Sequence, residues 1–181
     1  GPEVQAFSEE LQAYTGSRFV IPCGNGTDAL QIALMALGIG PGDEVITTGF
    51  TFISTIEVVA LLGATPVLVD VHSDTFNIQA EQVAAAITSR TKAIVPVHLF
   101  GQMADMDALL ALSEKTGIPL IEDNAQAISA RWYGAEGERK DAPQSGTLGL
   151  MGTTSFFPSK NLGCMGDGGA IMTNDETIAR K

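Results

Sequence analysis

The sequence predicts an α/β fold in which a mostly parallel, seven-stranded sheet carries helices on both faces. Short apolar runs alternate with helix-length segments along nearly the whole chain, which is typical of a parallel sheet covered on two sides. The runs are almost continuously apolar, as in Ala93–Val97, and this suits strands that are buried on both faces. A chain of 181 residues, of which 45% are apolar and 17% charged, is long enough for one such domain.

Each expected strand is a short run of apolar and β-branched residues that ends at a turn signal. The seven runs are Phe19–Cys23, Glu44–Thr48, Pro66–Val71, Ala93–His98, Ile118–Glu122, Thr154–Phe157 and Gly169–Thr173. Pro96 lies within the fourth run, and proline has no backbone N–H to donate to a neighbouring strand. This residue therefore favours an edge or an end of its strand.

Helices are expected between the strands, wherever apolar residues recur with helical spacing. The clearest are Thr27–Leu37, Ile53–Leu62, Ala80–Ile87 and Asp105–Thr116. The chain also opens with a helical pattern after Gly1 and stops within another at Thr177–Lys181. We therefore expect residues 1–181 to form one large domain of a longer chain.

The least regular segment is Arg131–Gly149, which is rich in glycine, proline, serine and charged residues. Such a composition is typical of a loop. We expect an exposed excursion between two strands here, with a short hairpin.

The charge of the chain argues against a nucleic-acid-binding surface. The formal net charge is −11, and the five lysines and five arginines are scattered, whereas binding to phosphates needs clustered cations. Cys23 and Cys164 are far apart, without metal-ligand spacing, and are expected to be reduced thiols. No apolar run reaches the roughly 20 residues of a membrane span, and no leader pattern opens the chain. We expect a cytoplasmic protein that binds neither membranes nor nucleic acid.

The first segment that could carry chemistry is the glycine turn Cys23–Thr27 at the start of a helix. Glycines allow close approach of a ligand, and the free N–H groups of a first helical turn favour phosphate. Thr27 could add a hydroxyl donor. The turn lacks the third glycine of a dinucleotide fingerprint and the lysine of a P-loop. The alternative is an ordinary glycine turn with Thr27 as the helix N-cap.

The second segment places Glu122 and Asp123 directly after a buried strand. Ligands of open parallel sheets bind at the carboxyl ends of strands. A carboxylate there can pair with the protonated nitrogen of a pyridine ring, which lets the ring act as an electron sink. The alternative is an acidic N-cap for a following helix. His98 ends a neighbouring strand at the same rim, where a hydrogen-bonded structural role is expected.

The third segment places Lys160 among small and apolar residues, with several glycines on its C-terminal side. Partial desolvation favours the neutral amine, which can form a Schiff base with a carbonyl compound. The alternative is an ordinary solvent-exposed lysine. Ser155 and Ser159 lack the turn of a hydrolase nucleophile, and no cluster has metal-ligand spacing, so hydrolysis and metal chemistry are not expected.

Five blocks together carry a family resemblance that no single block would. They are Asn25–Leu30, Pro41–Ile46, Val97–Gln102, Glu122–Gln126 and Ser155–Gly163. In order and spacing they resemble the DegT/DnrJ/EryC1/StrS family of pyridoxal-phosphate sugar aminotransferases, which have the fold type I of aspartate aminotransferase. The resemblance covers essentially all 181 residues.

The resemblance implies a role for each matching residue. Lys160 would carry pyridoxal 5'-phosphate as an internal aldimine and act as general acid and base in the proton shift. Asp123 would pair with the ring nitrogen, and Gln126 would lie near the ring hydroxyl. The remaining cofactor contacts would come from Gly26, Thr27 and Ser155 on the phosphate and from Phe52 against the ring. Without the family, Phe52 would be interpreted as a core residue of its helix.

The resemblance also implies substrates and partners. The amino group would come from glutamate and pass to a keto group of a nucleotide-linked sugar. The motifs are most similar to those of members that act on UDP-linked 3-keto sugars. Family members are homodimers with shared active sites and a smaller C-terminal domain, which we do not expect within residues 1–181. Sugar dehydratases of the family have histidine in place of the lysine, so Lys160 favours transamination. The alternatives are another fold-type-I enzyme, such as a sugar dehydratase or lyase, and a non-catalytic regulatory module.

Two departures concern the substrate side. Ile128 stands where the family often has histidine, and Gly149–Gly152 reads Gly-Leu-Met-Gly where the family tends to have Gly-Asp-Ile-Gly. The excursion before this position is also longer than is common in the family. Neither departure falls on a cofactor contact.

Overall fold

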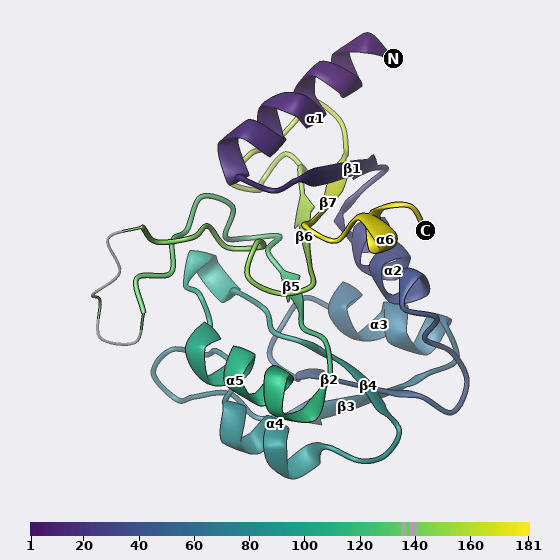
Figure 1. Ribbon diagram of the computed structural model, residues 1–181, viewed down its shortest axis with the longest axis vertical. Coiled ribbons are helices and arrows are strands. Elements are labelled where there is room, and N and C mark those ends of the chain that lie inside the picture. The colour runs from purple at the N-terminus through teal and green to yellow at the C-terminus, as the bar shows by residue number, and fades with distance from the viewer. Residues whose placement is uncertain (135–136, 138–140) are drawn as a thin grey trace.

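The computed structural model describes residues 1–134, 137 and 141–181, and its helices and strands alternate as expected (Figure 1). The strands are β1 (Phe19–Cys23), β2 (Glu44–Thr48), β3 (Thr65–Val69), β4 (Thr91–Val95), β5 (Ile121–Asp123), β6 (Met151–Ser155) and β7 (Gly169–Thr173). The helices are α1 (Pro2–Thr15), α2 (Gly26–Ala36), α3 (Ser54–Leu61), α4 (Ala80–Ala86), α5 (Met106–Thr116) and α6 (Glu176–Ala179), with a 3-10 turn at Leu99–Gly101. The prediction of an α/β fold is confirmed.

The predicted seven-stranded sheet is wrong, because the strands form two sheets. One is a four-stranded mixed sheet in the order β1-β7-β6-β5, and the other is a three-stranded parallel sheet in the order β3-β2-β4. β7 runs antiparallel to both β6 and β1. The connection from β6 to β7, residues 156–168, contains no crossover helix, so β7 returns in the opposite direction.

The division between the sheets lies between β4 and β5. Only two isolated parallel bridges join these strands, Ile94 with Leu120 and Val97 with Asp123. Pro96 lies between the two bridges and has no N–H with which to continue the ladder. Its carbonyl still accepts the Asp123 N–H at 2.9 Å. The carboxyl ends of β4 and β5 are therefore held side by side although the sheet is interrupted.

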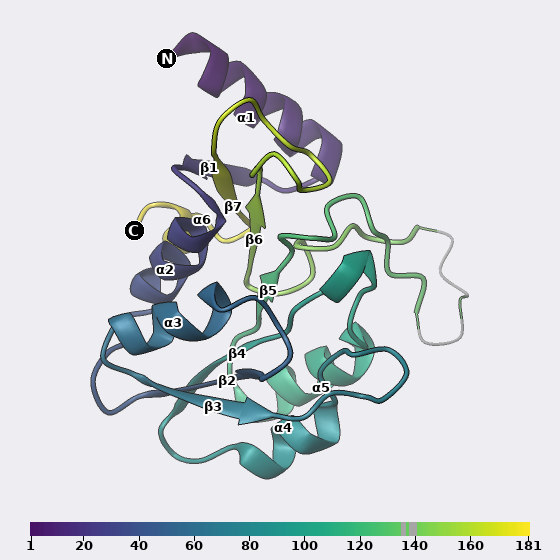
Figure 2. The same ribbon diagram turned by 180° about the vertical axis from the view of Figure 1, so that it is seen from behind.

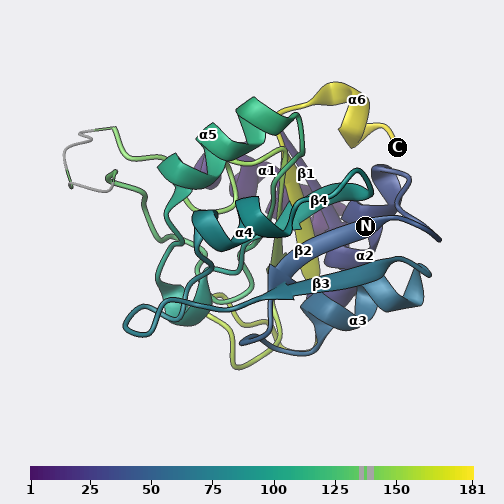
Figure 3. The ribbon, with the colours of Figure 1, turned by 90° about the horizontal axis from the view of Figure 1, so that it is seen from below.

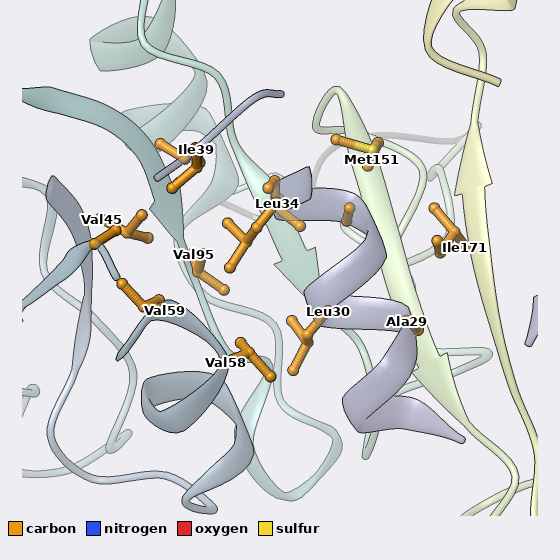
Figure 4. Close-up of a cluster of buried hydrophobic side chains, with 14 residues drawn as sticks. Ala29, Leu30, Leu34, Ile39, Val45, Val58, Val59, Val95, Met151 and Ile171 are labelled. Atoms are coloured by element: carbon orange, nitrogen blue, oxygen red, sulfur yellow. The ribbon is translucent and has the colours of Figure 1, made fainter. Parts of the chain in front are cut away.

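Helices cover both faces of the three-stranded sheet, as the sequence predicts (Figure 3). Alternate residues of a strand point to opposite sides of the sheet. Val45 of β2 packs in a cluster with Leu34 of α2 and with α3 (Figure 4). Its neighbour Ile46 packs in a second cluster with Val83 of α4 and Leu109 of α5.

A third apolar cluster joins α1 to the mixed sheet, and the ribbon shows α1 beside β1 (Figure 2). Leu11 of α1 packs there with Val20 of β1 and Met172 of β7. The rings of Phe7 and Phe156 meet edge to face, with centroids 5.1 Å apart. This packing fixes the chain directly after β6, where the loop that carries Lys160 begins.

The bounds of the predicted elements are less accurate than their order. β1, β2 and β7 have the predicted bounds, and the other four strands shift by one to three residues. The strand predicted to start at Thr154 starts at Met151, in the Gly-Leu-Met-Gly stretch. Gly152 packs closely against the backbone of Gly146. Glycine at this position therefore allows β6 to approach the preceding loop.

The excursion before β6 begins as the base of a hairpin, where Arg131 forms an antiparallel bridge with Gln144. The tip of the predicted hairpin falls on residues 135–136 and 138–140, which lie outside the described residues. The expected exposure is wrong for residues 144–146, which are buried.

The carboxylate of Glu122 explains this burial. Its Oε2 accepts the Gly146 N–H at 2.7 Å and lies 2.8 Å from the imidazole Nε2 of His98. Its Oε1 accepts the N–H groups of Leu148 and Gly149 at 2.7 and 2.6 Å. The fully buried carboxylate thus satisfies three backbone donors and fixes the loop to the end of β5.

Replacing Glu122 with glutamine is expected to lower the free energy of unfolding by about 3 kcal/mol, because an amide nitrogen cannot accept the buried N–H groups. Urea unfolding of the protein expressed from its complete gene measures this. Glu114→Gln, on the exposed side of α5, is the control and should change the unfolding midpoint little. Equal midpoints for the two variants would contradict the anchoring role.

Both cysteines are free thiols, with Cys23 partly buried and Cys164 exposed. Within the described residues, no group of three or more histidine, cysteine or acidic side chains is arranged to hold a metal ion. Nor does any helix in the described part of the chain have the length and apolar character needed to cross a membrane.

Candidate active site

A cavity of about 520 Å³ opens where the ends of β5 and β6 meet the first turns of α2 and α3. It lies at the edge where open α/β sheets bind ligands. Every residue that the sequence predicts for the site lines this cavity: Gly26, Thr27, Phe52, Asp123, Gln126, Ser155 and Lys160. The fold therefore brings together residues that are far apart in the sequence.

The start of α2 forms part of the cavity wall. Asn25, not Thr27, is the N-cap, because its side-chain oxygen accepts the Asp28 N–H at 2.8 Å. The alternative interpretation of Thr27 as an N-cap is thus wrong. The Thr27 hydroxyl instead lies 2.7 Å from the Ser54 hydroxyl. In the described structure no side chain caps the N–H groups of Gly26 and Thr27, which remain donors for an anion.

Gly26 lies against the end of β6. A Cβ atom at this position would lie 2.6 Å from the Cβ of Ser155, closer than side chains approach. Any other residue would push the first turn of α2 away from β6. Glycine therefore keeps the Ser155 hydroxyl and the N–H groups of α2 in one small region.

Gly26→Ala is expected to weaken the binding of pyridoxal phosphate at least about tenfold, because the overpacked turn would separate the phosphate donors. An absorbance titration of the apoprotein with the cofactor measures the dissociation constant. Gly40→Ala is the matched control, since a Cβ at Gly40 would meet only the Leu62 carbonyl, at 3.9 Å. Unchanged affinity in Gly26→Ala would contradict the assignment of this turn to the phosphate.

Asp123, at the end of β5, also lines the cavity and is only 5% exposed. Its Oδ2 accepts the Thr55 hydroxyl at 2.8 Å and its Oδ1 accepts the Ala125 N–H at 3.2 Å. Burial raises the pKa of Asp123, and these hydrogen bonds, with His98 and Lys160 nearby, only partly offset the effect. A cation placed beside this carboxylate would therefore be bound favourably. The alternative that Asp123 caps a following helix is wrong, because no helix begins between β5 and β6 in the described chain.

The adjacent acids have different surroundings. Glu122 is directed to the loop before β6 and Asp123 to the cavity. His98 has the expected hydrogen-bonded role, since its Nδ1 accepts the Ala104 N–H at 3.2 Å. A neutral imidazole then carries its proton on Nε2, which donates to Glu122.

Lys160 lies on a turn directly after β6. Its backbone N–H donates to the Phe157 carbonyl at 2.8 Å, and the residue is partly buried at the cavity wall. The alternative of an ordinary solvent-exposed lysine does not hold, because Lys160 has intermediate burial. Lys160 is the one lysine among the described residues that line the cavity.

Phe52 and Gln126 complete the predicted set. Phe52 precedes α3 and is 64% exposed, so the interpretation as a core residue is wrong and its ring is free to contact a ligand. The Gln126 Oε1 accepts the Phe100 N–H at 2.8 Å. No described residue accepts from the Gln126 side-chain NH₂ group, which remains a donor.

Sequence reasoning missed the hydroxyl side chains at the start of α3. Thr51, Ser54 and Thr55 line the cavity together with Phe52. Thr51 precedes the helix, and its hydroxyl lies 3.2 Å from that of Thr55. Asp167, on the connection to β7, also lines the cavity and was not predicted.

The residues present fit pyridoxal phosphate. A hydroxyl and backbone donors at Thr27 and the hydroxyl of Ser155 suit a phosphate. The buried carboxylate of Asp123 suits a protonated ring nitrogen, and the amine of Lys160 suits an aldehyde. These groups lie on the wall of one cavity, with phosphate donors and ring partner on different segments of it.

Comparison with known proteins gives a consistent set of relatives. A family model described as the DegT/DnrJ/EryC1/StrS aminotransferase family matches residues 1–181. The chain is 54% identical to UDP-2-acetamido-2-deoxy-3-oxo-D-glucuronate aminotransferase of Pseudomonas aeruginosa, over 99% of this chain and 48% of that protein. It is 51% identical to a Geobacillus stearothermophilus protein named pleiotropic regulatory protein, over 100% of this chain and 46% of that protein.

A solved structure is similar as well. NtdA from Bacillus subtilis, with bound cofactor PMP, matches with a TM-score of 0.88 and 36% identity, over 99% of this chain and 38% of that chain. The chain thus spans about half the length of the curated relatives it matches.

Proposed function

Because the chain belongs to the DegT/DnrJ/EryC1/StrS aminotransferase family, we propose that it forms the pyridoxal-phosphate-binding large domain of an aminotransferase. The proposed reaction transfers an amino group from glutamate to a keto group of a nucleotide-linked sugar. The observation that carries the proposal is the convergence of Lys160, Asp123 and the phosphate donors of Gly26, Thr27 and Ser155 on one cavity.

Each part of the cofactor has a partner in this proposal. Gly26, Thr27 and Ser155 hold the phosphate. Asp123 holds the protonated ring nitrogen, and the remaining contacts come from Phe52 on a face of the ring and Gln126 near its hydroxyl. The cofactor PMP, named in the NtdA structure, is the amino form of the same compound and supports the choice.

Lys160 performs the proton movement. When bound, pyridoxal phosphate supplies an electron sink for the carbon that loses its proton. The Lys160 amine would take a proton from that carbon and return it to the carbon on the other side of the linking nitrogen, first as a general base and then as a general acid. Asp123 keeps the ring nitrogen protonated and so maintains the sink. Lys160 in place of the dehydratase histidine favours amino transfer over dehydration.

The charges around the cavity support a homodimer with shared sites. Glutamate and a nucleotide-linked sugar are anions and need cationic partners. Among the described residues that line the cavity, Lys160 is the one cation, and Asp123 and Asp167 are acids. We propose that the cations for these substrates come from a partner subunit and from chain beyond residues 1–181. A cytoplasmic location remains a prediction.

The proposed substrate class can be tested with a panel of keto-sugar nucleotides. The 54% identical relative is named for a UDP-linked 3-oxo sugar acid, so the protein expressed from its complete gene is expected to aminate UDP-linked 3-keto sugars fastest, with glutamate as donor. Product formation by mass spectrometry is the measurement. Absence of amination across the panel, despite bound cofactor, would contradict the proposed reaction.

A regulatory role is the second candidate, because a 51% identical relative is named as a pleiotropic regulatory protein. The two proposals differ in their need for Lys160. A regulator that only binds a sugar nucleotide would keep its function in Lys160→Ala, whereas an aminotransferase would lose it. A lysine that lies near the buried Asp123 and lines the same cavity favours the enzyme.

A further inference from the structure

The first turn of α3 contacts residues that are assigned to the phosphate and residues that are assigned to the ring of the proposed cofactor. For the phosphate, the hydroxyl of Ser54 lies 2.7 Å from that of Thr27. For the ring, the Thr55 hydroxyl donates to Asp123 Oδ2 at 2.8 Å. Thr51 extends the chain of hydroxyls, with its Oγ1 3.2 Å from the Oγ1 of Thr55. One turn of helix therefore contacts both sets of residues through side-chain hydroxyls.

The hydrogen bond between Thr55 and Asp123 is buried. The exposed fractions of the two residues are 1% and 5%. Within the described part of the chain, two donors reach the carboxylate, the Thr55 hydroxyl on Oδ2 and the Ala125 N–H on Oδ1. The Thr55 bond is shorter than the 3.2 Å bond from Ala125, and it comes from a side chain, so it can be removed without changing the backbone.

We propose that Thr55 is a positioning residue that holds the Asp123 carboxylate in the orientation and charge state needed to pair with the protonated ring nitrogen of the cofactor. The inference rests on the proposed function, which makes Asp123 the partner of that nitrogen. Thr55 acts through Asp123, because its hydroxyl proton is directed to the carboxylate. The effect requires a donor, so valine, which has the same shape without the hydroxyl, removes it.

The hydrogen bond from Thr55 matters because Asp123 is buried, and burial disfavours the charged carboxylate. Burial is the largest influence on the pKa of Asp123 and raises it, and the Thr55 hydroxyl is the largest influence that lowers it. Titratable groups that face the carboxylate or share the cavity wall are His98 just before the 3-10 turn, Lys160 on the loop after β6 and Asp167 on the connection to β7. Without the hydroxyl, the pKa rises further and favours the neutral acid, which holds a protonated ring less well.

The test uses the protein expressed from its complete gene and loaded with pyridoxal phosphate. Thr55→Val is expected to lower kcat per bound cofactor about tenfold with little change in KM for glutamate, because a hydrogen bond to a charged group is lost. The pH midpoint of the absorbance change of the bound cofactor should rise by about one unit, because a less protonated ring makes the lysine-bound nitrogen more basic. Thr55→Ser keeps the donor and should recover most of both effects.

Thr47→Val is the matched control. Thr47 is fully buried and donates to the Val95 carbonyl at 2.8 Å, the same length as the Thr55 bond, but it does not line the cavity. This variant should keep the kcat and the pH midpoint of the wild type. Ser54→Ala, on the same turn as Thr55, should instead weaken cofactor affinity through Thr27 and leave the midpoint unchanged.

Three results would overturn the inference. They are a wild-type kcat and midpoint in Thr55→Val, equal losses in Thr55→Val and Thr47→Val, and no recovery in Thr55→Ser. Failure of the wild-type protein to bind pyridoxal phosphate would instead overturn the proposed function, and the inference with it. Cofactor titration of the wild type therefore separates the two failures.

Discussion

Replacing Lys160 with alanine is expected to lower the rate of amino transfer at least about a thousandfold, because the variant loses both the covalent attachment of the cofactor and the general acid and base. No other described lysine lines the cavity and could take its place. The steady-state rate with glutamate and a keto-sugar nucleotide is the measurement. The visible absorbance band of the lysine-bound cofactor should disappear in the same variant.

Lys92→Ala is the control for this experiment. Lys92 lies on β4 with its side chain exposed, away from the cavity. Its replacement should leave both the rate and the absorbance band unchanged. Retention of the band and of most activity in Lys160→Ala would contradict the role of this lysine.

The second large effect is expected for Asp123→Asn, with a fall in kcat of about a hundredfold or more. The amide has the same shape as the carboxylate but no charge, so it cannot keep the ring nitrogen protonated. The Thr55 hydroxyl would meet either the oxygen or the nitrogen of the amide, so packing should change little. Cofactor content and kcat, measured on the same sample, separate loss of binding from loss of rate.

Asp74→Asn, in an exposed turn far along the chain from β5, controls for the removal of one negative charge. It should keep the wild-type kcat. A wild-type kcat in Asp123→Asn with a full complement of cofactor would show that the carboxylate does not maintain the electron sink.

The order of helices and strands could be predicted from the sequence, because apolar periodicity and glycine turns are local signals. The single sheet could not, because the interruption depends on pairing between β4 and β5. Pro96 was the visible warning, but its effect depends on lying between two bridging pairs, at Ile94 and Val97. The reversed direction of β7 likewise depends on a connection whose path is set by tertiary packing.

The predicted site residues lie together because each belongs to a motif at the end of a strand or the start of a helix. Glu122 was recognised only as one of two adjacent acids. Its bonds to Gly146, Leu148 and Gly149 join segments more than twenty positions apart, and no local pattern reports such contacts. Thr55 was missed for the same reason, since its partner Asp123 lies on another element.

The central claim is that Lys160 carries pyridoxal phosphate, and one measurement tests it directly. The protein expressed from its complete gene is incubated with the cofactor, reduced with borohydride, digested and analysed by mass spectrometry. The mass of the reduced, lysine-linked cofactor is expected on the peptide that contains Lys160. Modification of another lysine in place of Lys160, or no modification after incubation with the cofactor, would contradict the claim.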